Sequence, residues 1–311
     1  MTGTDSIYQA ITDRIIKKIE AGTIPWQKPW TAAAGVPRNI VSKKPYQGVN
    51  VLILSTTEFS SPWWITFKQA KELGGNISKG SKSEIIVFFK RYEKTDGNGE
   101  FVYDENGRQR IGFVLRYSRV FNLEQTEGIK SPQGDLPSLE ATINDGDTGA
   151  VAKAKAIVES ARLCPITNGG SLPFYNPSRD RIVMPPIRAF KSLAAYYHTL
   201  FHEMTHATAH PSRLDRKSDN RGESYAAEEL VAEIGASFLS NTAGILSEIE
   251  FENSAAYLAG WLKALRDDRK LIVHAASAAQ KAADFILGSV LAPTVPAEDG
   301  QDSTQANLAA V

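Results

Sequence analysis

The segment His202-Glu203-Met204-Thr205-His206 has the pattern HExxH, which is the part of the sequence best suited to chemistry. On a helix, two histidines four residues apart lie on one face, about 5–6 Å from each other, so both imidazoles can bind one metal ion. Glu203 lies beside them, where its carboxylate can act as the general base toward a water molecule. The pattern is typical of metal-dependent hydrolysis, and we expect one divalent metal ion as cofactor, with Zn²⁺ as the first candidate.

A catalytic site of this kind needs a third protein ligand. The downstream segment ESYAAEELVAEIGASFLSN predicts a second helix, on which Glu229 and Glu233 lie about 40° apart among small residues. Small residues would let this helix approach the HExxH helix closely, whereas Glu228 lies about 100° away from Glu229. We expect Glu229 to bind the metal and Glu233 to orient a ligand histidine, and the reverse assignment stays open.

The elements that must position these residues belong to a mostly helical second module over 150–288. Two short extended pieces in LPFYNPSRDRIVMP precede the HExxH helix, and one of them could be an edge strand that pairs with a peptide substrate. Residues 289–311 carry too little apolar surface to fold, so we expect a disordered tail. Apolar periodicity predicts helices over 150–163, 190–210, 224–241, 253–268 and 271–287.

Residues 1–128 differ from the rest of the chain in charge and composition. They carry 18 Lys+Arg against 13 Asp+Glu, a net charge of +5, whereas residues 129–311 carry a net charge of −5. Apolar spacing predicts a helix over 6–20, WWITFKQAKELG suggests another, and two Gly-containing turns indicate β-hairpins. We therefore expect an α+β fold: a first module with an antiparallel sheet, a linker over 129–149, and the second module with a small sheet.

Basic and aromatic residues alternate along the first module, a combination that suits single-stranded DNA, because cations neutralise phosphates and rings stack on bases. Trp63 and Trp64 are adjacent, so we expect at least one of them to be exposed. Phe88 and Phe89 are interpreted as core residues. The predicted DNA-binding residues are Lys43, Lys44, Tyr46, Trp63, Trp64, Lys68, Lys79 and Lys82.

Composition excludes several other classes of protein. A single cysteine, Cys164, excludes an internal disulfide framework. No apolar run approaches the ~18 residues that a membrane-spanning helix needs. We therefore expect a cytoplasmic protein with no membrane partner.

Taken together, these segments resemble the ArdC-type antirestriction proteins of conjugative plasmids. The likeness in the first module is carried by IYQAITDRIIKKIEAGTIPWQKPW and SKKPYQGVNVLIL, and that region is also similar to the N-terminal part of TraC-type primases. HEMTHATAHPSRLDR and YAAEELVAEIGASFL carry the likeness to a zincin-like metallopeptidase domain. The resemblance implies single-stranded-DNA binding, a metal-dependent hydrolase fold and protection of incoming DNA from restriction enzymes.

Two functions from different classes fit this resemblance. The first is an antirestriction protein with an active peptidase, whose protein substrate would be a host restriction enzyme or another protein. The second is a DNA-shielding protein whose metallopeptidase domain is inert and structural. All residues needed for catalysis are present, which favours the first.

Overall fold

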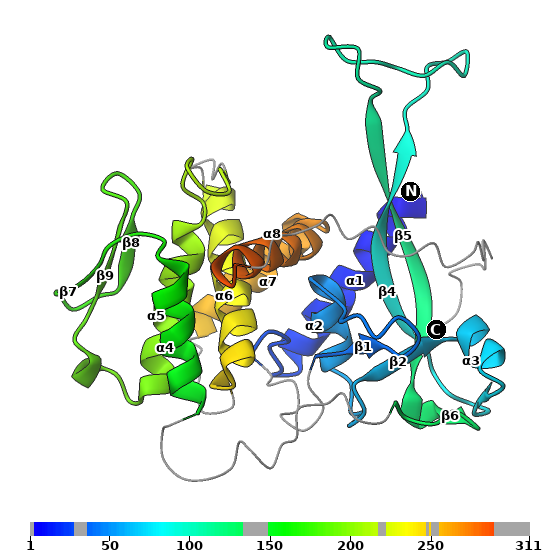
Figure 1. The fold of residues 1–311 in the computed structure, drawn as a ribbon, viewed down its shortest axis with the longest axis horizontal. Helices are drawn as coiled ribbons and strands as arrows, with labels where there is room; N and C mark the ends of the chain where they lie inside the picture. Colours follow the sequence, from blue (N-terminus) through cyan, green and yellow to red (C-terminus); the bar gives the residue numbers. More distant parts are fainter. Residues whose placement is uncertain are drawn as a thin grey trace.

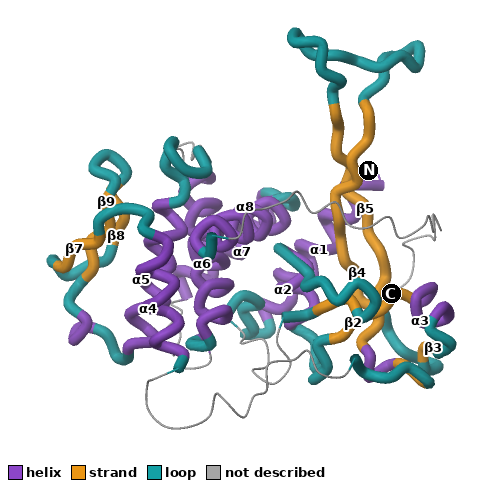
Figure 2. The backbone as a smooth tube through the Cα atoms, viewed as in Figure 1, coloured by secondary structure: helices purple, strands orange, loops and turns teal. Residues whose placement is uncertain are grey.

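The computed structural model describes residues 3–27, 36–132, 149–216, 222–246, 249 and 255–288. Figures 1 and 2 show two parts side by side: an α+β part formed by the first module and a mostly helical part formed by the second. The predicted α+β class is confirmed. Most of the predicted linker and the whole predicted tail lie outside the described residues.

The first module is built on a four-stranded sheet of order β1-β2-β5-β4, in which β1 is parallel to β2 and the other pairs are antiparallel. A separate two-stranded sheet joins β3 to β6. The elements of this module are α1 (Gly3–Glu20), β1 (Arg38–Asn39), α2 (Val49–Ser55), β2 (Trp63–Thr66), α3 (Phe67–Glu72), β3 (Asn76–Ile77), β4 (Glu84–Glu93), β5 (Ile111–Asn122), η1 (Leu123–Gln125) and β6 (Thr126–Glu127).

Strands β4 and β5 form one long hairpin that projects far beyond the rest of the module (Figure 1). The two Gly-containing turns that suggested separate hairpins both lie at its tip. In each turn an aspartate side chain accepts two backbone N–H groups: Asp96 from Asn98 and Glu100, at 2.8 and 3.0 Å, and Asp104 from two residues of the second turn, at 2.9 Å each. The sequence therefore indicates the turns correctly but not the length of the hairpin.

The segment WWITFKQAKELG is half strand and half helix, so the predicted helix is wrong at its start. Trp63 and Trp64 belong to β2, and the helix α3 begins only after Thr66, whose side chain accepts the backbone N–H of Gln69 in a capping box. Adjacent strand residues point to opposite faces of a sheet, and here both faces are covered. Trp64 joins the main core, and Trp63 packs in a smaller cluster with Ile40.

The second module packs helices beside a three-stranded sheet of order β7-β9-β8, in which β8 is an edge strand. Every helix that periodicity predicts here is present, with ends that differ by a few residues. The elements are α4 (Ala150–Ala161), β7 (Ile166–Asn168), β8 (Phe174–Asn176), β9 (Arg181–Met184), η3 (Ile187–Ala189), α5 (Leu193–Ala207), α6 (Gly222–Ala243), α7 (Ala255–Asp267) and α8 (Leu271–Ile286).

One buried cluster of apolar side chains runs through both modules, because α1 packs against the α7–α8 region of the second module. The Trp26 ring meets Trp261 edge-on at 5.2 Å between centroids. The Thr12 hydroxyl donates to the carbonyl of Arg269 at 2.7 Å. The two modules thus share one apolar core. Their opposite net charges, which suggested two modules, give no indication of it. Across the described ranges, no helix is long and apolar enough to cross a membrane.

Candidate metal centre

The HExxH residues lie in the last two turns of α5, whose N-terminus is capped by the Ser192 hydroxyl. Leu200 and Met204 on this helix are buried in the core, whereas His202 and His206 keep part of their surface exposed on another face. Apolar residues thus hold α5 in place, and the two imidazoles face α6.

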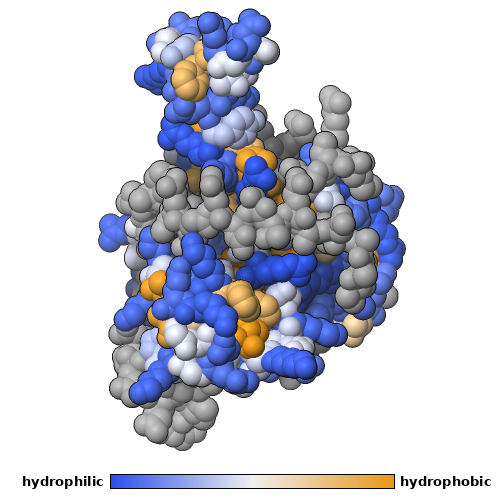
Figure 3. Space-filling view, turned by 90° about the vertical axis from the view of Figure 1, so that its right-hand side faces the viewer, coloured by the Kyte–Doolittle hydropathy of each residue, from blue (hydrophilic) through white to orange (hydrophobic). Residues whose placement is uncertain are grey.

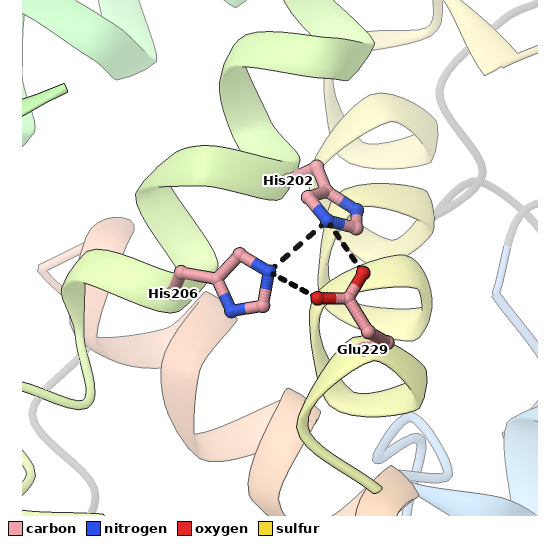
Figure 4. A group of neighbouring side chains, drawn as sticks. All are labelled: His202, His206 and Glu229. Carbon is pink, nitrogen blue, oxygen red and sulfur yellow. Dashed lines mark hydrogen bonds and ion pairs between the residues drawn. The ribbon is translucent and has the colours of Figure 1, made fainter. Parts of the chain in front are cut away.

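Both histidines turn their Nε2 atoms toward Glu229 of α6 (Figure 4). Glu229 Oε2 lies 3.5 Å from His202 Nε2, and Glu229 Oε1 lies 3.5 Å from His206 Nε2. The two Nε2 atoms are 3.1 Å apart. The structure therefore brings together the three side chains that the sequence suggests as metal ligands.

The other ring nitrogen of each histidine faces a different carboxylate of α6. Glu233 Oε1 lies 3.5 Å from His202 Nδ1, on the side away from Glu229. Glu228 Oε1 lies 3.2 Å from His206 Nδ1. A carboxylate on Nδ1 fixes the tautomer and orientation of an imidazole, leaving Nε2 free to bind metal. Sequence reasoning missed this role of Glu228, because its helical angle was compared only with that of Glu229. The two histidines lie on successive turns of α5, so they need not face the same carboxylate of α6.

Glu228 is itself held by Arg216, which follows α5 in the chain. Arg216 Nη2 donates to Glu228 Oε1 at 2.7 Å and to the backbone carbonyl of Thr205 at 2.9 Å. Arg216 thereby links the carboxylate behind His206 to the helix that carries His206.

Close packing of α5 on α6 depends on a glycine. A Cβ atom added to Gly235 would lie 2.7 Å from the Thr205 side chain, which is too close for a non-bonded contact. Since Thr205 lies between the metal-facing histidines in sequence, this contact sets how near the carboxylates of α6 come to them. The run of small residues in α6 is the sequence signal for this approach.

Electrostatics at the site favour a bound cation. Burial by itself lowers the pKa of His206, but hydrogen bonds to Glu228 and Glu229 outweigh burial and raise that pKa to about 9. Burial by itself raises the pKa of Glu229, but the interactions with His202 and His206 outweigh burial, and the resulting pKa lies below its ordinary range. When both imidazoles are neutral, the negative charge of the carboxylates that face them is therefore not balanced at this site.

The general-base candidate Glu203 is buried next to this cluster. Burial raises the pKa of its carboxyl, and the neighbouring His202 and His206, together with a hydrogen bond with the backbone of Tyr175, oppose the shift. Tyr175 is the central residue of β8, the edge strand of the small sheet. This contact places the edge strand directly beside the HExxH residues.

The donor set fits a divalent metal ion. The ligand atoms of His202, His206 and Glu229 all lie within 4.8 Å of one another. Two imidazoles and one carboxylate form a ligand set used by catalytic zinc sites, which keep a further position open.

Among the predicted DNA-binding residues, the two tryptophans lie in the interior and so do not share a surface with the exposed lysines. Trp63 and Trp64 are each only 1% exposed, so the expectation that at least one presents its ring to solvent is wrong. Both faces of the sheet at β2 are covered by other elements, which explains the burial. Tyr46 is half-buried, and the lysines that are exposed are Lys43, Lys44, Lys68, Lys79 and Lys82.

Two family models match the chain. The N-terminal domain of anti-restriction factor ArdC matches residues 5–121, and a zincin-like metallopeptidase matches residues 152–278. Crystal structures of the antirestriction ArdC protein from the R388 plasmid share 38% sequence identity with this chain and cover 91% of it and 97% of their own chains. The TM-score is 0.70 for the metal-free structure and 0.68 for the Mn(II)-bound one.

Curated relatives agree with this picture. Two proteins from Escherichia coli named DNA primase TraC are 34% and 36% identical over 90% of this chain, which spans only 20% and 27% of their lengths. The uncharacterized protein y4eC of Sinorhizobium fredii (strain NBRC 101917 / NGR234) is 31% identical over 92% of both chains.

Proposed function

The chain belongs to the ArdC family of antirestriction proteins, and from this premise we propose that it protects incoming plasmid DNA from host restriction in the cytoplasm. In this proposal the first module binds single-stranded DNA and the second is an active metallopeptidase. The observation that carries the peptidase part is the pair of Nε2 atoms directed at one carboxylate, with Glu203 beside them. The peptide substrate would be a restriction enzyme or another host protein.

We assign His202, His206 and Glu229 as the residues that would hold one divalent ion, with Zn²⁺ as the first candidate. When bound, such an ion supplies a Lewis acid that lowers the pKa of water and polarises a carbonyl group. The Mn(II)-bound structure of the R388 protein supports a divalent ion without deciding between manganese and zinc.

The remaining steps fall to side chains and backbone of this chain. Glu203 accepts a proton from the attacking water and delivers it to the leaving amine, and burial raises its carboxyl pKa toward the range useful for both roles. Glu233 and Glu228 hold the two imidazoles in orientation through Nδ1. The edge strand β8 pairs with the extended backbone of the peptide beside Glu203.

A restriction-protection assay with Glu203→Gln tests this function. Glutamine keeps the size of the side chain but cannot act as a base, so we expect the variant to fold and bind single-stranded DNA like the wild type while protection of unmodified DNA is lost. If the variant protects as well as the wild type, the peptidase is not needed, and the domain acts as a structural part of a DNA-shielding protein.

A further inference from the structure

The outer half of the β4–β5 hairpin packs on neither module. Near the body, Val87 and Leu115 are buried, and Asn50 of α2 exchanges two hydrogen bonds with the backbone of Val87, at 2.7 and 2.8 Å. Beyond Phe88, every residue of β4 is exposed. We call residues 88–94 and 110–116 the distal arm, which leaves the body at Phe88 and at the buried Leu115 and is largely exposed beyond them. An isolated two-stranded ribbon is at best marginally stable in water. The exposed residues of the distal arm are therefore better explained by a function than by a contribution to folding.

Strand register divides the distal arm into two faces. Phe88 lies opposite Arg116, Lys90 opposite Val114 and Tyr92 opposite Gly112, and the backbone N–H of Lys94 donates to the carbonyl of Arg110 at 2.9 Å. Because side chains alternate between faces, these residues share one side of the ribbon. We call this side the cationic face, and its polar members are Lys90, Tyr92, Lys94, Arg110 and Arg116.

The cationic face contains four positive charges and no acidic residue. All four cationic residues are exposed, and within the described part of the chain none of them forms an ion pair. Positions on one strand face repeat about every 6.7 Å, twice the rise per residue, so Lys90 and Lys94 lie about 13 Å apart along one strand, and Arg110 and Arg116 about 20 Å apart along the other. Like charges spread along one face with no acidic residue among them suit a polyanion.

Tyr92 is the exposed aromatic residue of this face, because Phe88 is half-buried at the base of the arm, and the Tyr92 ring lies flat over a glycine. A Cβ atom at Gly112 would lie 2.3 Å from Tyr92 Cζ, so the ring occupies the space that any other residue would fill. The side chain is 47% exposed. One side of the ring is thus fixed on the ribbon while the other is open, an arrangement that suits stacking with a nucleic-acid base.

The neighbouring surfaces are much less suited to DNA. On the opposite face Phe89, Ile111 and Phe113 are exposed, so the interpretation of Phe89 as a core residue is wrong, and the charges of Arg91 and Glu93 on that face cancel. The tip carries four acidic residues, including Asp96 and Asp104, which would repel phosphates. Figure 3 shows the arm rising above the body with a small apolar area among hydrophilic residues.

We propose that the cationic face of the distal arm binds single-stranded DNA, with its four cations on phosphates and Tyr92 stacked on an unpaired base. The proposal rests on the proposed function in one respect, namely that the protein binds single strands at all. Duplex DNA offers phosphates but no unpaired base to Tyr92, which is why a single strand is favoured.

The test measures binding of a fluorescent oligothymidine over a range of salt concentrations. Lys90→Gln combined with Lys94→Gln should weaken binding and flatten the slope of log K against log salt by about 1.4, roughly 0.7 for each phosphate that is no longer neutralised. The matched control, Lys153→Gln with Lys263→Gln, removes the same charge from exposed helix positions of the second module and should bind like the wild type.

Tyr92 is tested separately because stacking is insensitive to salt. Tyr92→Ala should weaken binding roughly 5- to 150-fold with an unchanged salt slope, and Tyr92→Phe should restore most of the affinity. A tip truncation that replaces residues 95–109 by Asn-Gly keeps the pair Lys94 and Arg110 and should bind at least as tightly as the wild type, because it removes acidic residues.

The outcomes separate the two proposals. If the wild type does not bind the oligonucleotide, single-strand binding itself is wrong. If the wild type binds and the arm variants match the control, the arm proposal is overturned while the proposed function survives. If affinity is lost only in the variant Lys43→Gln with Lys44→Gln, the arm proposal is overturned in favour of the body of the module. If the arm variants lose the same affinity for duplex DNA as for single strands, the role of Tyr92 is overturned.

Discussion

The metal centre and the distal arm hold their functional side chains in opposite ways. At the candidate metal centre, two helices with buried apolar faces fix the distances between the side chains, and each histidine proposed as a ligand has a carboxylate behind it. On the distal arm, only strand register and one glycine place the exposed side chains. Changes at the centre should therefore affect both packing and metal binding, whereas changes on the arm should affect the binding of single-stranded DNA and leave the packing unchanged.

The largest expected effect is loss of the metal. Wild-type protein should contain about one divalent ion per chain, and His202→Ala combined with His206→Ala should contain none, because two of its three ligands are removed. Elemental analysis of purified protein measures this, with Glu203→Gln as a control that keeps the ion. Full occupancy in the double variant would place the metal elsewhere.

The next largest effect tests whether the paired tryptophans belong to the core. Trp64→Ala should lower the free energy of unfolding by about 3–5 kcal/mol, because it removes a large buried ring that is 1% exposed. Phe113→Ala on the distal arm should change it by less than about 0.5 kcal/mol, since that ring is 65% exposed. Denaturant titration measures both, and similar losses would mean that the arm is packed in solution.

Packing and metal binding should be coupled at Gly235. Gly235→Ala should cost about 1–3 kcal/mol of stability and weaken metal binding, because the new Cβ pushes α6 away from Thr205. Gly260→Ala on α7 is the matched control: nothing lies within 4 Å of its added Cβ, so it should stabilise the protein by up to about 1 kcal/mol. Unchanged metal affinity in Gly235→Ala would show that the ligand distances do not depend on this contact.

A smaller effect is expected at the carboxylate behind His206. Glu228→Gln should weaken metal binding about 10- to 100-fold while leaving the ligands in place, because the amide orients the imidazole less strongly. Isothermal titration calorimetry with Zn²⁺ on metal-stripped protein measures it. The surface variant Glu159→Gln, whose carboxylate is paired with Lys155 on α4, is the control and should show no change.

The same contrast explains what the sequence could predict. HExxH, helix periodicity and the carboxylates of α6 are local patterns, and they lead to the helices of the second module and to the side chains that meet at the centre. The role of Glu228 depends on how two helices are rotated against each other, which no local pattern specifies.

In the first module the deciding features are non-local. Burial of Trp63 and Trp64 follows from the covering of both sheet faces, to which residues distant in the sequence, such as Ile40 and Leu123 beside Trp63, contribute. Exposure of Phe89 follows from the length of the hairpin. The sequence pattern of β4 predicts a half-buried strand, but beyond Phe88 this strand has nothing to pack on. The core that joins the modules likewise depends on contacts between residues more than 200 positions apart.

The last prediction concerns that shared core and expects almost no effect. A protease site introduced within residues 133–148 should allow the chain to be cut while the two halves still elute together in size-exclusion chromatography, because Trp26 packs on Trp261 and Thr12 bonds to Arg269 across the boundary. High salt should not release them, since the exposed ion pair of Glu20 with Arg266 contributes little to such an interface. Trp261→Ala should weaken the association enough for the cut halves to separate, while the uncut variant stays together because the tether keeps the effective concentration high. Separation of the cut wild-type halves would mean that the modules are held together by the linker alone.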